Sequence, residues 1–80
     1  MTSIAAIFIR IAPPIPIIET VPPAPGPNYY WVPGYWVWEG GRYVWHRGAY
    51  VVRPFRNAAW VPGHWDHTVR GWHWVPGHWR

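Results

Sequence analysis

One six-residue pattern, an aromatic residue followed by glycine and a second aromatic, recurs four times and restricts the fold more than any other feature. The four copies begin at Trp31, Trp45, Trp60 and Trp74, so successive starts are 14, 15 and 14 residues apart. A larger unit is also repeated, because residues 31–50 fall on residues 60–79 after a shift of 29 positions. A fixed period of this kind predicts repeated supersecondary units that bury their faces against each other.

Aromatic residues within each unit are spaced as in a β-strand. Trp36 and Trp38 are two residues apart, as are Tyr43 and Trp45, and this period places each pair on one face of a strand. Gly40-Gly41 lies between the two pairs and is typical of a two-residue hairpin loop. The resulting register predicts that Trp36 lies opposite Trp45 and that Trp38 lies opposite Tyr43.

The second unit predicts a similar hairpin with a less favourable turn. Residues 68–71 would form this turn, although Val69 resists a positive φ. The same register places Trp65 opposite Trp74 and Asp66 opposite His73.

A Pro-Gly pair follows Trp-Val in three copies, at residues 33–34, 62–63 and 76–77. Pro-Gly fits the central positions of a type II turn, in which the glycine takes a positive φ. That turn twists the wrong way for a tight hairpin, so a corner at which a strand bends is the alternative. The four expected turn glycines are Gly34, Gly48, Gly63 and Gly77. We therefore predict an all-β chain of about eight short antiparallel strands in two Trp-rich hairpin units.

The first 28 residues differ in composition from the rest. The alternation of Ile7, Ile9 and Ile11 predicts a β-strand over residues 4–11, too short to span a membrane and without the basic start of a signal peptide. A truncated signal peptide is the alternative. Residues 13–27 contain seven of the eleven prolines, which predicts an extended arm. We divide the chain into a strand and proline-rich arm, 1–28, and a β domain, 29–80, with copies 29–50 and 58–80.

The motif copies resemble the WxxGxW (or YxWGxW) repeat family of small bacterial cell-envelope proteins. Three copies keep the pattern in full: Trp31-Gly34-Trp36, Trp60-Gly63-Trp65 and Trp74-Gly77-Trp79. The copy Trp45-Gly48-Tyr50 departs at its last position. The resemblance implies export to the periplasm or cell surface, although residues 1–12 contain no clear signal peptide, and it brings no catalytic residues.

The composition speaks against several kinds of chemistry. The absence of cysteine excludes disulfides, thiolate zinc sites and a thiol nucleophile, and three acidic residues leave little scope for a carboxylate pair. We expect no enzyme activity and no cofactor. His64, Asp66 and His73 would share one strand face, which makes them weak candidates for a metal site. The alternative is that His64 only fills the variable motif position at which Tyr35 stands in the first copy.

Self-association is the function that the sequence favours. The hydrophobic gain from burying every aromatic ring about equals the entropy lost on ordering so small a domain. We expect an aromatic assembly face and a strand at Ile7, Ile9 and Ile11 that is donated to a second copy, or that folds back on its own sheet. The aromatic set is Trp31, Trp36, Trp38, Tyr43, Trp45, Trp60, Trp65, Trp72, Trp74 and Trp79. These features predict a self-assembling structural protein that forms an oligomer or a filament.

Two other kinds of partner, a polysaccharide and a nucleic acid, also suit a chain rich in aromatic residues. A flat aromatic face also suits pyranose rings, so polysaccharide binding is the alternative function. Nucleic acid is a less favoured partner, because the net charge of +4 comes from arginines that form no basic run.

Overall fold

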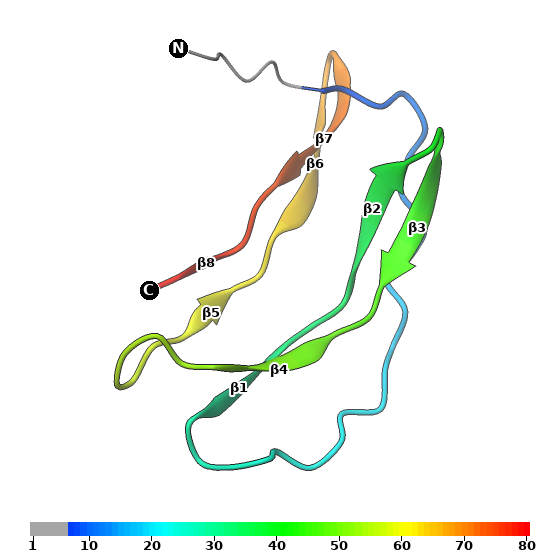
Figure 1. Cartoon of the computed structure of the whole chain (residues 1–80). Helices are drawn as coiled ribbons and strands as arrows, with labels where there is room; N and C mark the ends of the chain where they lie inside the picture. Colours follow the sequence, from blue (N-terminus) through cyan, green and yellow to red (C-terminus); the bar gives the residue numbers. More distant parts are fainter. Residues whose placement is uncertain (1–6) are drawn as a thin grey trace.

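A computed structural model describes residues 7–80, which form two long β-hairpins and an N-terminal arm (Figure 1). Hairpin 1 (residues 29–52) contains β1 (Tyr29–Val32), β2 (Tyr35–Glu39), β3 (Arg42–His46) and β4 (Ala49–Val52). Hairpin 2 (residues 60–79) contains β5 (Trp60–Val61), β6 (His64–Thr68), β7 (Gly71–Val75) and β8 (His78–Trp79). The predicted all-β class with eight short antiparallel strands is confirmed.

Each hairpin consists of two two-stranded antiparallel sheets that meet at a corner in the middle. In hairpin 1, β2 pairs with β3 and β1 pairs with β4. The register continues unbroken across the corner, since Trp31 faces Tyr50 and Trp36 faces Trp45. Hairpin 2 repeats the arrangement, with Trp65 facing Trp74 beyond its corner. The predicted cross-strand pairs are therefore confirmed in both hairpins.

The Pro-Gly pairs lie at these corners, where the chain bends without reversing. Positive φ among the described glycines is confined to Gly40, Gly41 and Gly71, so the motif glycines do not adopt a type II turn. The type II prediction is wrong because the unbroken register carries both strands through the corner in the same direction. The alternative, a corner at which the strand bends, is the one observed.

The chain reverses at the two hairpin tips, which are built differently. Gly40 and Gly41 have φ values of 61° and 77°, as a type I′ turn requires. In the second tip, the Thr68 hydroxyl donates a hydrogen bond to the Gly71 carbonyl at 2.9 Å and accepts one from the Arg70 amide at 3.1 Å. Gly71 has a φ of 123°, so a glycine rather than Val69 takes the left-handed conformation.

The segments lie side by side in chain order. Figure 1 shows the N-terminal arm (the arm, residues 11–22) on the side of hairpin 1 that faces away from hairpin 2. Ile9 forms an isolated antiparallel bridge to Trp72, and the rest of residues 7–11 is not strand. The expected strand over residues 4–11 is thus reduced to one bridge in its described part, and residues 4–6 lie outside that part.

The interior of the molecule is small. Across residues 7–80 the buried hydrophobic residues are Ile9 and Ala58, and no large side chain is fully buried. All nine tryptophans are half-buried. The part of the chain described here also contains no helix of the length and apolarity needed to cross a bilayer.

Candidate functional site

The repeated motif forms an interlock between its two copies in each hairpin. In hairpin 1, the Trp31 ring packs against Tyr50 at 5.2 Å and lies over Gly48, both from the second copy. In return, the Trp45 ring packs against Trp36 and lies over Gly34. The first aromatic residue of each copy therefore covers the glycine and contacts the last aromatic residue of the other copy.

Lack of space explains why glycine occupies the second fixed position of the motif. A Cβ atom at Gly34 would lie 2.6 Å from the Trp45 ring and 2.6 Å from the His46 carbonyl oxygen. In hairpin 2, Gly63 lies under Trp74 and Gly77 lies under Trp60 in the same way. These glycines, predicted as turn residues, are instead required by the close approach of an indole ring.

The two hairpins contact each other through aromatic side chains of hairpin 2. The Trp65 indole donates a hydrogen bond of 3.0 Å to the Trp36 carbonyl and packs edge-to-face with Tyr43. Trp74 stacks on Tyr35, with ring centroids 5.0 Å apart and planes 17° from parallel. The face of hairpin 2 that carries Trp65 and Trp74 is therefore covered by β2.

The corresponding face of hairpin 1 is covered by the arm. The Tyr43 hydroxyl donates to the Ile11 carbonyl at 2.5 Å, and partial burial raises the pKa of Tyr43. The Trp36 indole donates to the Ile15 carbonyl at 3.2 Å. The Tyr50 hydroxyl donates to the Pro22 carbonyl at 2.5 Å. Sequence reasoning missed these contacts, because no local pattern links the arm to the hairpin.

The Glu19 carboxylate anchors the middle of the arm at the corner of hairpin 1. Its oxygens accept hydrogen bonds from the Gly48 amide at 3.0 Å and from the Trp45 indole at 3.2 Å. The hydrogen bond from the Gly48 amide is the main reason that the pKa of Glu19 is lowered, whereas partial desolvation of the carboxylate acts to raise that pKa. The ionised carboxylate of Glu19 therefore holds the arm against hairpin 1.

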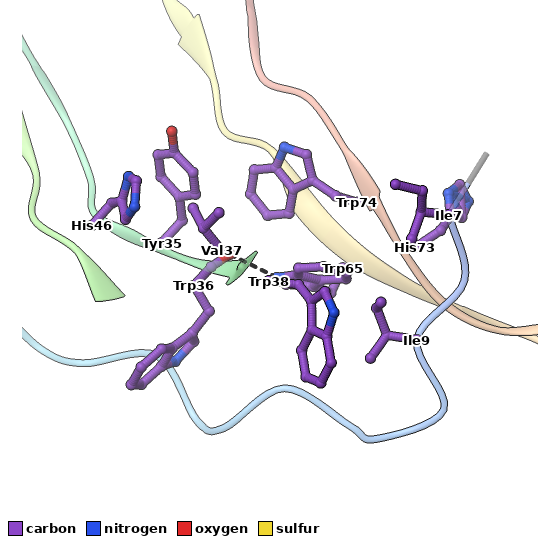
Figure 2. A pocket seen from close by; sticks show the side chains of 10 residues that line it. All are labelled: Ile7, Ile9, Tyr35, Trp36, Val37, Trp38, His46, Trp65, His73 and Trp74. Atoms are coloured by element: carbon purple, nitrogen blue, oxygen red, sulfur yellow. Dashed lines mark hydrogen bonds between the residues drawn. The ribbon is translucent and has the colours of Figure 1, made fainter. Parts of the chain in front are cut away.

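A groove of about 520 Å³ lies between the β2–β3 half of hairpin 1 and the β6–β7 half of hairpin 2 (Figure 2). Its lining is mostly aromatic and aliphatic: Ile7, Ile9, Tyr35, Trp36, Val37, Trp38, His46, Trp65, His73 and Trp74. Figure 2 shows that Trp38 and Trp65 approach Ile9 from different hairpins. The N-terminal residues thus complete a groove that the hairpins begin.

The predicted aromatic assembly face is divided between several contacts. Trp38 packs with Tyr43 across hairpin 1, and Trp60 packs with Trp79 across the open end of hairpin 2. Trp72 stacks on His67, with ring centroids 4.3 Å apart and planes 5° from parallel. The backbone of Trp72 also exchanges two hydrogen bonds with Ile9. The ten aromatic residues therefore serve the two hairpins, the contact between them and the arm, rather than one continuous face.

The three residues of the weak metal candidate lie on one side of hairpin 2. His73 and Asp66 face each other, with His73 Nε2 and the Asp66 carboxylate 3.6 Å apart, and His64 is exposed. Glu39 and His46 form a second pair of this kind at 3.7 Å in hairpin 1. Within residues 7–80, no three His, Asp or Glu side chains are arranged to hold a metal ion.

Comparison with known proteins agrees with the repeat geometry. A family model described as the WXXGXW repeat matches two copies, over residues 26–49 and 59–80. No curated protein and no solved structure matches the chain. The family match covers more than half of the chain, and its two copies coincide with the two hairpins. The chain belongs to the WXXGXW repeat family.

Proposed function

We propose that this chain is a non-enzymatic structural protein of the bacterial envelope whose copies assemble with one another. One observation carries the proposal: all nine tryptophans remain half-buried in the single chain. Large aromatic side chains contribute most to stability when contact with a neighbour removes them from water. Association between copies is the direct way to bury this remaining surface.

The strand edges support the same proposal. Each hairpin contains two two-stranded sheets, and such a sheet leaves backbone groups on both edges available to another segment. Two of these edges already bind other parts of the chain. The backbone carbonyl of Trp36 accepts a hydrogen bond from the Trp65 indole, and the backbone of Trp72 pairs with that of Ile9. Apolar side chains in the arm are also exposed, among them Ile15 at 88 % and Ile18 at 98 %.

Location in the periplasm or at the cell surface is part of this proposal. It rests on the resemblance to cell-envelope proteins and on the family match. Cell fractionation of the native organism, with an antibody against the chain, would test it. Recovery of the chain only from the cytosol would contradict it.

Sedimentation velocity of the full chain over a range of concentrations tests assembly directly, with negative-stain microscopy of the same samples. We expect regular assemblies whose tryptophan emission shifts to shorter wavelength as the aromatic rings lose water. A monomer at every concentration, with unchanged emission, would overturn the proposal.

Polysaccharide binding is the second candidate, and the groove between the hairpins favours it. Trp38, Trp65 and Trp74 line the groove, and aromatic rings of this kind stack on the apolar faces of sugars. Addition of a cell-wall polysaccharide would then shift the tryptophan emission, and Trp38→Ala would abolish that shift. An emission spectrum that no polysaccharide changes would remove this candidate and leave assembly unaffected.

A further inference from the structure

The contact of the arm with hairpin 1 reproduces the contact of hairpin 1 with hairpin 2. The Trp65 indole donates to the carbonyl of Trp36 in β2. Trp36 is equivalent to Trp65 after the 29-residue shift, and its indole donates to the carbonyl of Ile15 in the arm. The arm therefore occupies against hairpin 1 the position that β2 occupies against hairpin 2.

The chemistry of this contact suits a proline-rich segment. Each side-chain bond from hairpin 1 to the arm backbone uses an indole or phenol donor and an arm carbonyl acceptor, at Ile11, Ile15 and Pro22. Proline has no N–H, so a proline-rich chain can accept such bonds without leaving donors of its own unpaired. Aromatic-lined surfaces with side-chain donors are a general means of binding extended proline-rich peptides. We call the set Trp36, Tyr43, Trp45, Gly48 and Tyr50 the docking track.

The arm can leave the docking track without breaking either hairpin. The strands of both hairpins pair within the hairpins themselves, so this pairing does not depend on the arm. Ile15 and Ile18 are largely exposed, and burial of apolar surface is concentrated at Ile9, which is 7 % exposed. Residues 23–28, Pro-Ala-Pro-Gly-Pro-Asn, connect the arm to β1 and lie outside regular secondary structure.

We infer that the docking track is a binding site for an extended proline-rich segment, and that residues 11–22 of a second copy bind it in exchange for the chain's own arm. This inference rests on the proposed self-assembly and specifies exchange of the arm as the way in which the copies associate. The exchanged arm makes the same contacts in the second copy, so the balance between the closed and exchanged forms depends on chain concentration and on the connecting residues.

Two variants with complementary defects test the exchange in the full chain. Glu19→Arg damages the arm and leaves the docking track intact. Tyr43→Phe combined with Tyr50→Phe removes two donors of the docking track and leaves the arm intact. A mixture then contains one intact arm and one intact track, on different chains. We expect a 1:1 heterodimer in native mass spectrometry, at least about tenfold more abundant than the dimer of either variant alone.

Matched controls and a peptide make the result specific. Glu39→Arg and Tyr29→Phe alter a carboxylate and a hydroxyl that form no hydrogen bond to the arm, and mixing these two variants should not raise the heterodimer signal. A synthetic peptide of residues 11–22 should compete with the heterodimer, whereas the same peptide with Glu19→Arg should not. If near-UV circular dichroism shows a disturbed fold in the double variant, Tyr50→Phe alone replaces it.

Absence of the heterodimer from a mixture of folded variants overturns the inference. Failure of the exchange can be told apart from failure of the proposed function. If the wild-type chain assembles in sedimentation velocity but the mixture gives no heterodimer, assembly uses other surfaces and only the exchange is wrong. If the wild-type chain is monomeric at every concentration but the mixture gives the heterodimer, the docking track exists and the assembly proposal is wrong.

Discussion

Hairpin 1 and hairpin 2 share one plan over a shift of 29 residues, yet a different segment covers the aromatic face of each. The arm covers hairpin 1 through Ile15 and Glu19, whereas β2 covers hairpin 2 through Tyr35 and the Trp36 carbonyl. The interlocked motif is the same in both hairpins. The fixed residues of the repeat therefore build each hairpin, whereas the identity of the variable residues depends on the segment that packs against that hairpin.

On the opposite side of each hairpin, too, the residues at the variable positions match what lies against them. Val37 in hairpin 1 lines the groove toward hairpin 2, and its equivalent in hairpin 2 is the exposed Asp66. Val44 is likewise replaced by His73, which pairs with Asp66. Terminal units of repeat proteins carry polar outer faces because no further unit covers them, and here the N-terminal residues cover this side in part, since the Phe8 ring packs against His73 at 5.4 Å. Stacking of another hairpin onto this side is therefore disfavoured, and the arm remains the better route between copies.

The largest effect is expected from filling the space under a motif tryptophan. Gly63→Ala would place a Cβ against the Trp74 ring and the Val75 carbonyl, and we expect a loss of about 1–3 kcal/mol in the free energy of unfolding. Gly34→Ala should cost a similar amount if the interlock is equivalent in the two hairpins. Urea unfolding followed by tryptophan fluorescence measures both. Gly26→Ala is the control, since its Cβ would meet only ordinary contacts at 3.6 Å.

A second large effect is expected at the bridge between the N-terminal residues and hairpin 2. Ile9→Asp removes an apolar side chain that is 7 % exposed, and we expect a loss of about 2 kcal/mol in the free energy of unfolding. Ile7→Asp is the matched control, because Ile7 is 71 % exposed and its replacement should change stability little. Equal losses in the two variants would show that the Ile9 side chain is not buried as described.

A smaller effect on stability is expected to differ between two equivalent positions, Tyr35 in hairpin 1 and His64 in hairpin 2. Tyr35→Ala removes the ring that stacks on Trp74, which should cost about 1 kcal/mol in the free energy of unfolding. His64→Ala changes the equivalent exposed residue of hairpin 2 and should alter that free energy by less than about 0.5 kcal/mol. Urea titrations of the two variants against the wild-type chain make the comparison. A larger loss for His64→Ala would reverse the assignment of the covered and uncovered sides.

The smallest effect is a pH dependence confined to hairpin 1. The pKa of Glu19 is lower in the folded chain than in the unfolded chain, so its contribution to arm binding is complete above the unfolded value. That contribution is lost as the pH falls through the lowered folded value. Amide chemical shifts of Gly48 and its equivalent Gly77, recorded from neutral to acidic pH, follow the change. We expect an acidic transition at Gly48 that Glu19→Gln removes, and a transition unchanged in that variant would contradict the assignment.

Much of the hairpin geometry was predictable, because it is local. Gly40-Gly41 and the two-residue spacing of the aromatic residues predicted the register of hairpin 1 correctly. The role of the motif glycines was mistaken, because Pro-Gly suggested a turn and the covering indole comes from the other strand. One signal was available: motif copies 14 residues apart on the two strands of a hairpin must face each other in antiparallel order. The contacts of Glu19 had no such signal, since they join segments 26 and 29 residues apart without any shared period.

Hydrogen exchange of the indole N–H groups tests most directly the claim that each hairpin's aromatic face is covered by the segment before it. Within residues 7–80, the indoles of Trp36, Trp45 and Trp65 are the ones that donate hydrogen bonds. We predict slow exchange for these three, and loss of protection at Trp36 and Trp45 but not at Trp65 when Glu19→Arg releases the arm. Rapid exchange of all three in the wild-type chain, or an equal loss at Trp65 in the variant, would contradict the account.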